Sequence, residues 1–293
     1  MELTGKTAFI TGGASGIGLA FARQCAGYGA TVLLADIEDA ALQAAASGLR
    51  DMGAKVGTYR LDVSDRVNYE AVVDAVIVEY GAPYLLFNNA GVAWKAPASI
   101  ATPSDWEWLV KVNILGLGYG ISLIVPKMVD AGVGGYVVNT GSISGLLTPV
   151  GTASVYAMTK HAVVAISEAL AHELRGCGIH VAVVCPGQVA TNIINSDRNL
   201  ASGVAGASIS QAGPEERAFS SSMVARGLSP DEVAIRTFKA LEERRTYVIT
   251  HPEYKDDIIV RHRQIENAIT GAPETDVDLL ALVKSMITLE PLT

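Results

Sequence analysis

The sequence predicts one doubly wound α/β domain, in which a parallel sheet of seven strands is covered by helices on both faces. Three observations support this prediction. Short apolar runs alternate with longer segments of helical spacing, a glycine-rich turn closes the first run, and 49 % of the residues are hydrophobic against 18 % charged. A chain of 293 residues forms a core that buries roughly three quarters of its unfolded surface, so neither disulfides nor metals are needed for folding.

The expected strands and helices alternate along the whole chain. The strands are short apolar runs bounded by turn residues, at 6–11, 31–36, 55–61, 84–88, 136–139, 179–184 and 247–250. The helices have apolar residues three and four positions apart, at 16–28, 37–52, 104–131, 154–175 and 229–245, with one more that is capped at Ser64 or Asp65 and runs to Tyr80. Pro126 predicts a kink in the long helix. Gly116, Gly118 and Gly120 predict close packing there, against the sheet or across a subunit interface.

Two segments of the chain differ in composition or pattern from the alternating strands and helices. We expect a catalytic domain over 1–250 and a helical extension over 251–293 that packs on or beside it, with amphipathic stretches at 253–269 and 275–289. Within the domain, 190–227 is rich in small residues and follows the sixth strand, which predicts a substrate lid.

Composition excludes several classes of function. Lys and Arg total 22 against 30 Asp and Glu, a net charge of -8, which favours neither nucleic acid nor anionic lipid as a partner. Cys25, Cys177 and Cys185 are an odd number without metal-ligand spacing, in stretches typical of the core or its edge, so we expect no disulfide framework and no metal. No apolar run approaches the roughly 20 residues of a membrane span. The N-terminus leads directly into a strand, so we expect a cytoplasmic protein.

The first strand is followed by a loop suited to a dinucleotide. Residues 11–18 read Thr-Gly-Gly-Ala-Ser-Gly-Ile-Gly, and the next helix would present its unpaired N–H groups to a pyrophosphate. Asp36 ends the second strand, where a carboxylate can accept hydrogen bonds from the adenosine ribose and repel a 2′-phosphate, which favours NAD. Glu38 and Asp39 are alternatives for this position. Asp62 ends the third strand and either meets the adenine amino group or caps a helix.

A second constellation carries acid–base chemistry. Tyr156 and Lys160 lie four positions apart in a helical stretch, so their side chains share one face. An ammonium group near a phenol stabilises the phenolate and makes the tyrosine a usable acid or base. Ser142 follows the fifth strand, where its hydroxyl could hold a substrate oxygen beside Tyr156.

These residues together resemble the short-chain dehydrogenase/reductase family over about 6–250. The motifs that carry the resemblance are the loop 11–18, Asn88-Asn89-Ala90-Gly91, Asn113, Ser142, Tyr156-Ala157-Met158-Thr159-Lys160 and Pro186-Gly187, with Thr191 following. The resemblance implies a Rossmann-type fold with Tyr156 as general acid/base, Ser142 orienting the substrate oxygen, Lys160 binding the nicotinamide ribose and lowering the tyrosine pKa, and Asn113 positioning a water.

The same resemblance implies a set of cofactor contacts. Those residues are Gly12, Ser15, Gly16, Ile17, Gly18, Asp36, Asp62, Val63, Asn89, Ala90, Gly91, Tyr156, Lys160, Pro186, Gly187, Val189 and Thr191, with Val189 and Thr191 at the nicotinamide carboxamide. The interval from Ser142 to Tyr156 is 14 positions, one longer than in the family, which leaves Ser144 as an alternative to Ser142.

We therefore predict an oxidoreductase that transfers hydride between NAD and a secondary alcohol or ketone. Apolar side chains near the expected site favour a bulky apolar, aromatic or cyclic substrate; they are Trp94, Leu146, Leu147, Val150, Ile193 and Ile194. The alternative is an NAD-binding sensor or partner-binding protein of the same fold without turnover. By the same resemblance, the helices carrying Gly116–Gly120 and Tyr156–Leu174 imply a homo-oligomer, a dimer or a tetramer.

Overall fold

The computed structural model describes residues 1–94, 97–148, 153–199, 222 and 224–269 of the chain. Val150 and most of the expected lid, at 200–221 and 223, lie outside these described residues, as does the amphipathic stretch 275–289.

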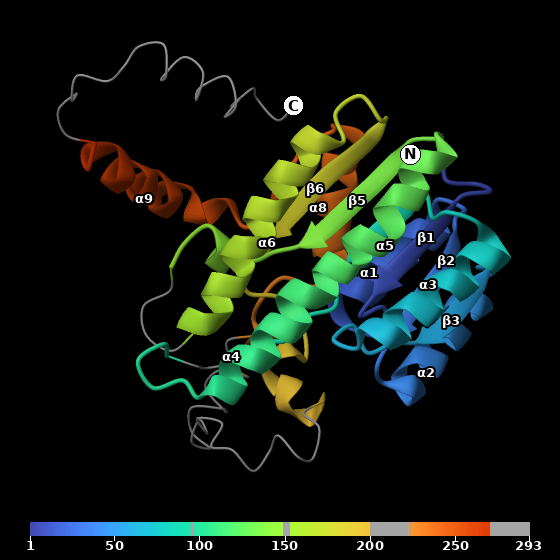
Figure 1. Ribbon diagram of the computed structural model, residues 1–293, viewed down its shortest axis with the longest axis horizontal. Coiled ribbons are helices and arrows are strands. Elements are labelled where there is room, and N and C mark those ends of the chain that lie inside the picture. Colours follow the sequence, from blue (N-terminus) through green and yellow to red (C-terminus); the bar gives the residue numbers. More distant parts are fainter. Residues whose placement is uncertain (95–96, 149–152, 200–221, 223, 270–293) are drawn as a thin grey trace.

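Seven parallel strands form one sheet in the order β3-β2-β1-β4-β5-β6-β7 (Figure 1). The strands are β1 (Thr7–Thr11), β2 (Thr31–Asp36), β3 (Val56–Arg60), β4 (Leu85–Asn88), β5 (Gly135–Thr140), β6 (Ile179–Cys185) and β7 (Tyr247–Ile249). The chain runs outward from β1 to β3 and then returns to start again at β4. The carboxyl ends of β1 and β4 therefore border the point where the strand order reverses, which is where sheets of this type bind ligands. The predicted fold class is confirmed.

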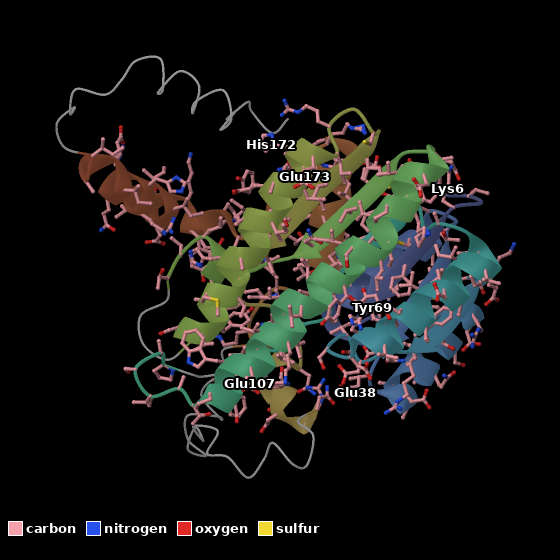
Figure 2. The ribbon with its side chains drawn as sticks, viewed as in Figure 1. Lys6, Glu38, Tyr69, Glu107, His172 and Glu173 are labelled. Atoms are coloured by element: carbon pink, nitrogen blue, oxygen red, sulfur yellow. The ribbon has the colours of Figure 1, made fainter. Side chains whose placement is uncertain are left out.

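Helices cover both faces of the sheet. One face carries α1 (Gly16–Gly27), α2 (Asp39–Asp51) and α8 (Pro230–Glu242), and the other carries α3 (Arg66–Tyr80), α5 (Gly116–Ala131) and α6 (Ser154–Glu173). Phe87 of β4 stacks on Phe21 of α1 and on Phe238 of α8, with ring centroids 4.8 and 6.1 Å apart. On the opposite face, Tyr69 of α3, which is labelled in Figure 2, meets Tyr119 of α5 edge to face. Burial of these aromatic and aliphatic side chains holds the layers together.

Local sequence signals explain where the helices begin. Asp65, and not Ser64, caps α3, because its carboxylate accepts hydrogen bonds from the amides of Val67 and Asn68. Thr102 and Asp105 form a capping box at α4 (Pro103–Val110). Ser229 caps α8 through the amide of Glu232, as expected.

The long helix differs from the expected one in the place of its irregularity. It runs from α4 through the π-helical turn η1 (Lys111–Leu115) into α5. Pro126 lies inside α5, which continues past it to Ala131. The irregular turn therefore carries Asn113, and π-helical turns inside α-helices are frequent at functional sites.

Two of the three glycines in α5 pack inside the protomer. A Cβ on Gly120 would lie 2.1 Å from Asn88 Oδ1, and one on Gly116 would lie 2.8 Å from a methyl group of Val63. Gly118 has no such neighbour. The sequence left two explanations for these glycines, packing against the sheet or packing across a subunit interface. Packing against the sheet and its loops explains Gly116 and Gly120.

Contrary to the expectation from the sequence, the long helix has the length and composition of a membrane span. Pro103–Ala131 is 29 residues long and predominantly apolar. Its side chains Leu109, Ile124, Val125 and Met128 are buried in the fold, so in this structure it is a helix packed on a sheet.

Beyond β7, the turn η4 (Pro252–Tyr254) leads to α9 (Lys255–Asn267), which projects from the body of the molecule (Figure 1). None of the residues of α9 is buried. The division into 1–250 and 251–293 stays a prediction. The cysteines are unpaired, and the expectation that all lie in the core or at its edge is wrong for Cys177, which is exposed in the turn after α6.

Candidate active site

The glycine-rich loop packs too tightly for larger residues. Gly12 and Gly16 have positive φ angles of 62° and 53°, where glycine is favoured. A Cβ on Gly18 would lie 2.1 Å from the carbonyl oxygen of Gly12. The loop can therefore close on itself and bring backbone N–H groups at the start of α1 toward an anionic ligand.

Asp36 lies against this loop, as the sequence predicts. Its carboxylate accepts hydrogen bonds from the amide of Ala14 (3.0 Å) and from the amide of Glu38 (3.1 Å). Burial raises the pKa of Asp36, and the two amide hydrogen bonds oppose that rise. Glu38, the alternative, is instead bonded to Arg198, and Asp39 is the first residue of α2. Of the three carboxylates, Asp36 is thus the one bonded to the glycine-rich loop.

Thr11 and Asn89 join the ends of three strands. The Thr11 hydroxyl donates to the carbonyl of Phe87 and accepts from the amides of Asn89 and Ala90, at 3.0–3.2 Å. The Asn89 amide donates to the carbonyls of Thr11 and Gly12, and its Oδ1 accepts from the Thr140 hydroxyl. These bonds place the 89–91 loop directly on the glycine-rich loop.

Lys160 and Asn113 lie together behind Gly91. Lys160 is buried, and its Nζ donates to the carbonyl of Thr140 at 2.8 Å. A Cβ on Gly91 would lie 3.2 Å from Asn113 Oδ1 and 3.5 Å from Lys160 Nζ. Burial lowers the pKa of Lys160 to about 8. Glycine at position 91 therefore lets the loop approach both side chains.

The Asn113 amide spans two elements. Its Oδ1 accepts from the amide of Val92 (2.8 Å), and its Nδ2 donates to the carbonyl of Val92 (2.9 Å) and to the Thr159 hydroxyl (3.1 Å). Thr159 in turn donates to the carbonyl of Tyr156. Asn113 thus connects the 89–92 loop to the helical turn that carries Tyr156. The expected role of this residue in positioning a water stays a prediction.

Of the two serines, Ser142 is the one close enough to Tyr156 to lower the pKa of the phenol, which favours Ser142 over Ser144 as its partner. The Ser142 hydroxyl accepts from the amide of Ser144 at 3.1 Å. Burial raises the pKa of Tyr156 to about 12, although Ser142 opposes the rise. The Lys160 ammonium group donates to the Thr140 carbonyl and lies 5.8 Å from the centre of the phenol ring. The expected lowering of the tyrosine pKa by Lys160 stays a prediction.

The segment after β6 contacts both the turn after β5 and the glycine-rich loop. Pro186 accepts a hydrogen bond from the amide of Ile143 beside Ser142, and Thr191 packs against Gly16. In the following turn η3 (Ile193–Asn199), the Ser196 hydroxyl accepts from the amide of Ala93. Arg198 in the same turn donates twice to the Glu38 carboxylate. This described part of the expected lid is therefore attached to the loops after β2 and β4.

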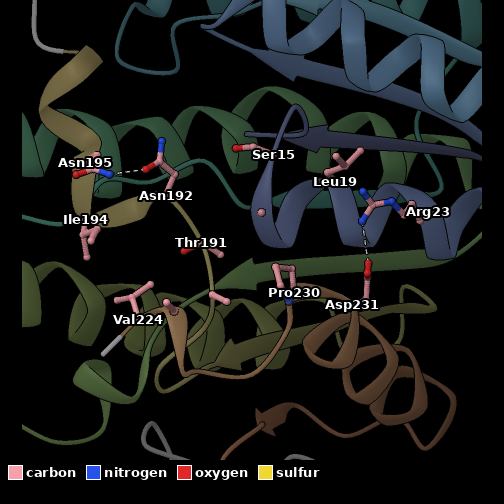
Figure 3. Close-up of a pocket in the computed structure, with 13 residues that line it drawn as sticks. Ser15, Leu19, Arg23, Thr191, Asn192, Ile194, Asn195, Val224, Pro230 and Asp231 are labelled. Carbon is pink, nitrogen blue, oxygen red and sulfur yellow. Dashed lines mark hydrogen bonds and ion pairs between the residues drawn. The ribbon is translucent and has the colours of Figure 1, made fainter. Parts of the chain in front are cut away.

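A cavity of about 600 Å³ lies between the start of α1 and this segment (Figure 3). Ser15, Gly16, Thr191 and Asn192 line it, and the ion pair of Arg23 with Asp231 (2.9 Å) lies at one side. Ser142, Tyr156 and Lys160 do not line it. The cavity is thus next to the glycine-rich loop and the segment after β6.

The remaining predicted contacts are near the same edge of the sheet. Asp62 accepts from the amide and hydroxyl of Ser64 in a local turn, so it does not cap α3 itself. Val63 is buried against Gly116, and Ile17 packs on the core beneath the loop. Trp94 packs on Trp108 with ring centroids 5.9 Å apart, in the apolar cluster that Tyr156 also contacts.

Two residues that build this site were not indicated by the sequence motifs. Arg198 and His251 act through hydrogen bonds to residues far along the chain. Only the fold brings those partners together.

Comparison with known proteins agrees with this geometry. Residues 6–200 match the short chain dehydrogenase family. A "CLA biosynthesis dehydrogenase/reductase" of Lactiplantibacillus plantarum is 30 % identical over 283 residues, 93 % of this chain and 96 % of that protein. A "3beta-hydroxysteroid dehydrogenase 2" of Eggerthella lenta is 36 % identical over 65 % of this chain and 74 % of its own.

A solved structure is similar over nearly the whole length. It is a short chain dehydrogenase/reductase from Burkholderia phymatum in complex with NAD, 34 % identical, with a TM-score of 0.86 over 94 % of this chain and 99 % of that one. The chain described here belongs to the short-chain dehydrogenase/reductase family of oxidoreductases.

Proposed function

We propose that this protein is an NAD-dependent dehydrogenase that transfers hydride between NAD and a secondary alcohol or ketone. The observation that carries the proposal is that Ser142, which follows β5, lies close to Tyr156 and Lys160 of α6 at the carboxyl edge of the sheet, beside the glycine-rich loop. The catalytic and cofactor roles given below to individual residues are part of this proposal.

The residues around the loop fit a dinucleotide. Glycines leave backbone amides open to a pyrophosphate, and Asp36 offers a carboxylate to the adenosine ribose. Arg198 is a cation near this carboxylate, but its guanidinium is already paired with Glu38. The 2′-phosphate of NADP would be repelled by Asp36, and Arg198 would not be free to neutralise it. This supports NAD over NADP. The similarity to a protein solved with NAD supports the same choice.

In the proposed reaction, bound NAD supplies the hydride acceptor. The Ser142 hydroxyl would hold the substrate oxygen next to Tyr156. The phenolate form of Tyr156 would take the alcohol proton as hydride passes from the carbinol carbon to NAD, and in the reverse direction the protonated phenol would give its proton to the ketone oxygen. Lys160 holds its ammonium group behind this pair, fixed by the Thr140 carbonyl. Asn113 keeps the turn of α6 that carries Tyr156 in place through Thr159.

The apolar cluster beside Tyr156 supports a bulky substrate. Trp94, Trp108, Val92 and Met158 belong to the same cluster as the tyrosine, and aromatic walls favour large apolar or cyclic ligands. One relative is named for a hydroxysteroid, a bulky cyclic alcohol. A cytoplasmic location and a homotetramer complete the proposal.

A panel of secondary alcohols tests this function. The protein is mixed with NAD and each alcohol, and formation of NADH is followed by absorbance. We expect turnover with bulky cyclic or aromatic alcohols above that with short aliphatic ones. If NADH binds but no alcohol of the panel is oxidised, the proposed activity is wrong and the alternative, a sensor of the same fold, is favoured.

A further inference from the structure

His251 is a buried histidine outside the residues that the family resemblance assigns. It follows β7 directly, and its ring lies against the loop that leaves β6 at Pro186. That loop continues to Val189 and Thr191, the expected contacts of the nicotinamide end of the cofactor.

Both ring nitrogens of His251 bind this loop. Nδ1 accepts a hydrogen bond from the amide of Gly187 at 2.9 Å, and Nε2 lies 3.0 Å from the carbonyl oxygen of Gln188. An amide can only donate and a carbonyl can only accept, so the imidazole is neutral with its proton on Nε2. The Thr250 hydroxyl, 2.8 Å from Nδ1, is consistent with this tautomer. One side chain therefore bonds two consecutive residues of the loop.

The packing around the ring leaves little freedom. A Cβ on Gly187 would lie 2.9 Å from Cγ of His251 and 2.9 Å from a ring carbon of Tyr254. On the other side of the loop, the amide of Leu228 donates to the same Gln188 carbonyl, and the amide of Ala190 donates to the carbonyl of Leu228. The 187–190 backbone is thus fixed from two sides.

The same backbone connects to the glycine-rich loop. A Cβ on Gly16 would lie 3.1 Å from the Thr191 methyl group, so a shift of 187–190 would change the gap between Thr191 and the start of α1. Thr191 and Gly16 both line the cavity of Figure 3.

We propose that His251 is a positioning residue for the dinucleotide: in its Nε2-protonated form it fixes the 187–191 backbone at the distance from α1 that the bound cofactor requires. This inference rests on the proposed function.

Three substitutions separate the two hydrogen bonds. In His251→Asn the amide oxygen can replace Nδ1 and keep the Gly187 bond. In His251→Gln the amide nitrogen can replace Nε2 and keep the Gln188 bond. His251→Phe keeps the ring shape and loses both bonds. His262→Phe is the matched control, because His262 is exposed on α9.

The readout is the dissociation constant for NADH, measured on folded protein by fluorescence titration together with the melting temperature. We expect His251→Phe to weaken NADH binding by about tenfold, the Asn and Gln variants to lie between it and the unmodified protein, and His262→Phe to bind normally. A purely structural role would lower the melting temperature and leave the dissociation constant unchanged, and that result would overturn the proposal.

Nitrogen NMR of the unmodified protein, with labelled histidine, tests the tautomer even if the Phe variant does not fold. A His251 signal with the proton on Nε2 supports the proposal, and a proton on Nδ1 contradicts it. If the unmodified protein itself does not bind NADH, the proposed function fails instead, which distinguishes the two failures.

Discussion

Lys160 holds an ammonium group inside the fold at a cost to stability. It is 4 % exposed, and burial lowers its pKa from 10.5 to about 8. The Thr140 carbonyl compensates only part of the lost hydration. A group with this environment is typical of functional sites, where stability is given up for chemistry.

We therefore expect Lys160→Met to inactivate the protein and yet raise the unfolding free energy of the cofactor-free form at pH 7, by roughly 1–3 kcal/mol. Between about pH 8 and 10.5, the window set by the two pKa values, the unfolded chain binds a proton that the folded protein does not, so the unmodified protein gains stability with rising pH. The difference in unfolding free energy between Lys160→Met and the unmodified protein should therefore become smaller across this pH window. Urea unfolding at several pH values measures it, and a less stable Met variant at pH 7 would refute the argument.

Asp36 sets the expected choice of cofactor. Its carboxylate can bond the ribose hydroxyls of NAD but repels a 2′-phosphate, and Arg198 is occupied by Glu38. We expect kcat/KM to favour NAD over NADP by at least about tenfold, or roughly 1.4 kcal/mol, and Asp36→Ala to relax this preference in part. Asp36→Asn is the matched control. It removes the negative charge but keeps an oxygen that can accept the hydrogen bond from the Ala14 amide, so it separates the effect of the charge from the loss of that bond. Equal kcat/KM with both cofactors in the unmodified protein would remove Asp36 from this role.

At the scale of elements, the turn η3 is attached to the rest of the fold by few bonds. Arg198 pairs with Glu38 at 2.7 Å, and Asn199 donates to the same carboxylate oxygen at 3.0 Å. The Arg198 guanidinium lowers the pKa of Glu38, chiefly through their hydrogen bonds. Because both side chains are about one-third exposed, this attachment is weak enough to open.

We expect Glu38→Gln to speed hydrogen exchange of the amides in 193–199 by roughly two- to fivefold, which corresponds to about 0.5–1 kcal/mol for a partly exposed pair. Glu70→Gln, which breaks an exposed ion pair with Arg66 on α3, is the control and should leave these amides unchanged. Exchange that is equally slow in both variants would show that the ion pair does not hold the turn.

The elements themselves were predictable to different degrees. The strands and most helices follow from apolar periodicity, and the structure confirms them within a few residues. The π-helical turn at Asn113 was not predictable, because it depends on how α4 and α5 pack against the 89–92 loop. The site shows the same limit: local motifs indicate Ser142, Tyr156 and Lys160, whereas the roles of His251 and Arg198 depend on a backbone carbonyl 63 positions away and a side-chain carboxylate 160 positions away.

At the scale of the whole molecule, apolar side chains remain exposed on two surfaces. Ile235 of α8 and Ile249 of β7 are 51 and 39 % exposed, and Leu115 of η1 and Ile166 of α6 are each 41 % exposed. Apolar groups at the edge of a sheet and on packed helices favour association. They support the proposed homo-oligomer, with one surface at the β7 edge and another on the long helices.

Light scattering should therefore give a mass that is a multiple of 30.6 kDa at micromolar concentration. Ile249→Glu, at the free edge of the sheet, should lower this mass, because a buried carboxylate without a partner opposes association. A single 30.6 kDa species for the unmodified protein would contradict the proposed assembly.

The central claim is that Tyr156 transfers the proton that accompanies hydride transfer with NAD. The direct measurement is turnover of Tyr156→Phe with the best alcohol of the panel, together with its affinity for NADH. We expect normal folding and NADH binding but a loss of at least about a hundredfold in turnover, since phenylalanine cannot exchange a proton. Turnover equal to that of the unmodified protein would contradict the account.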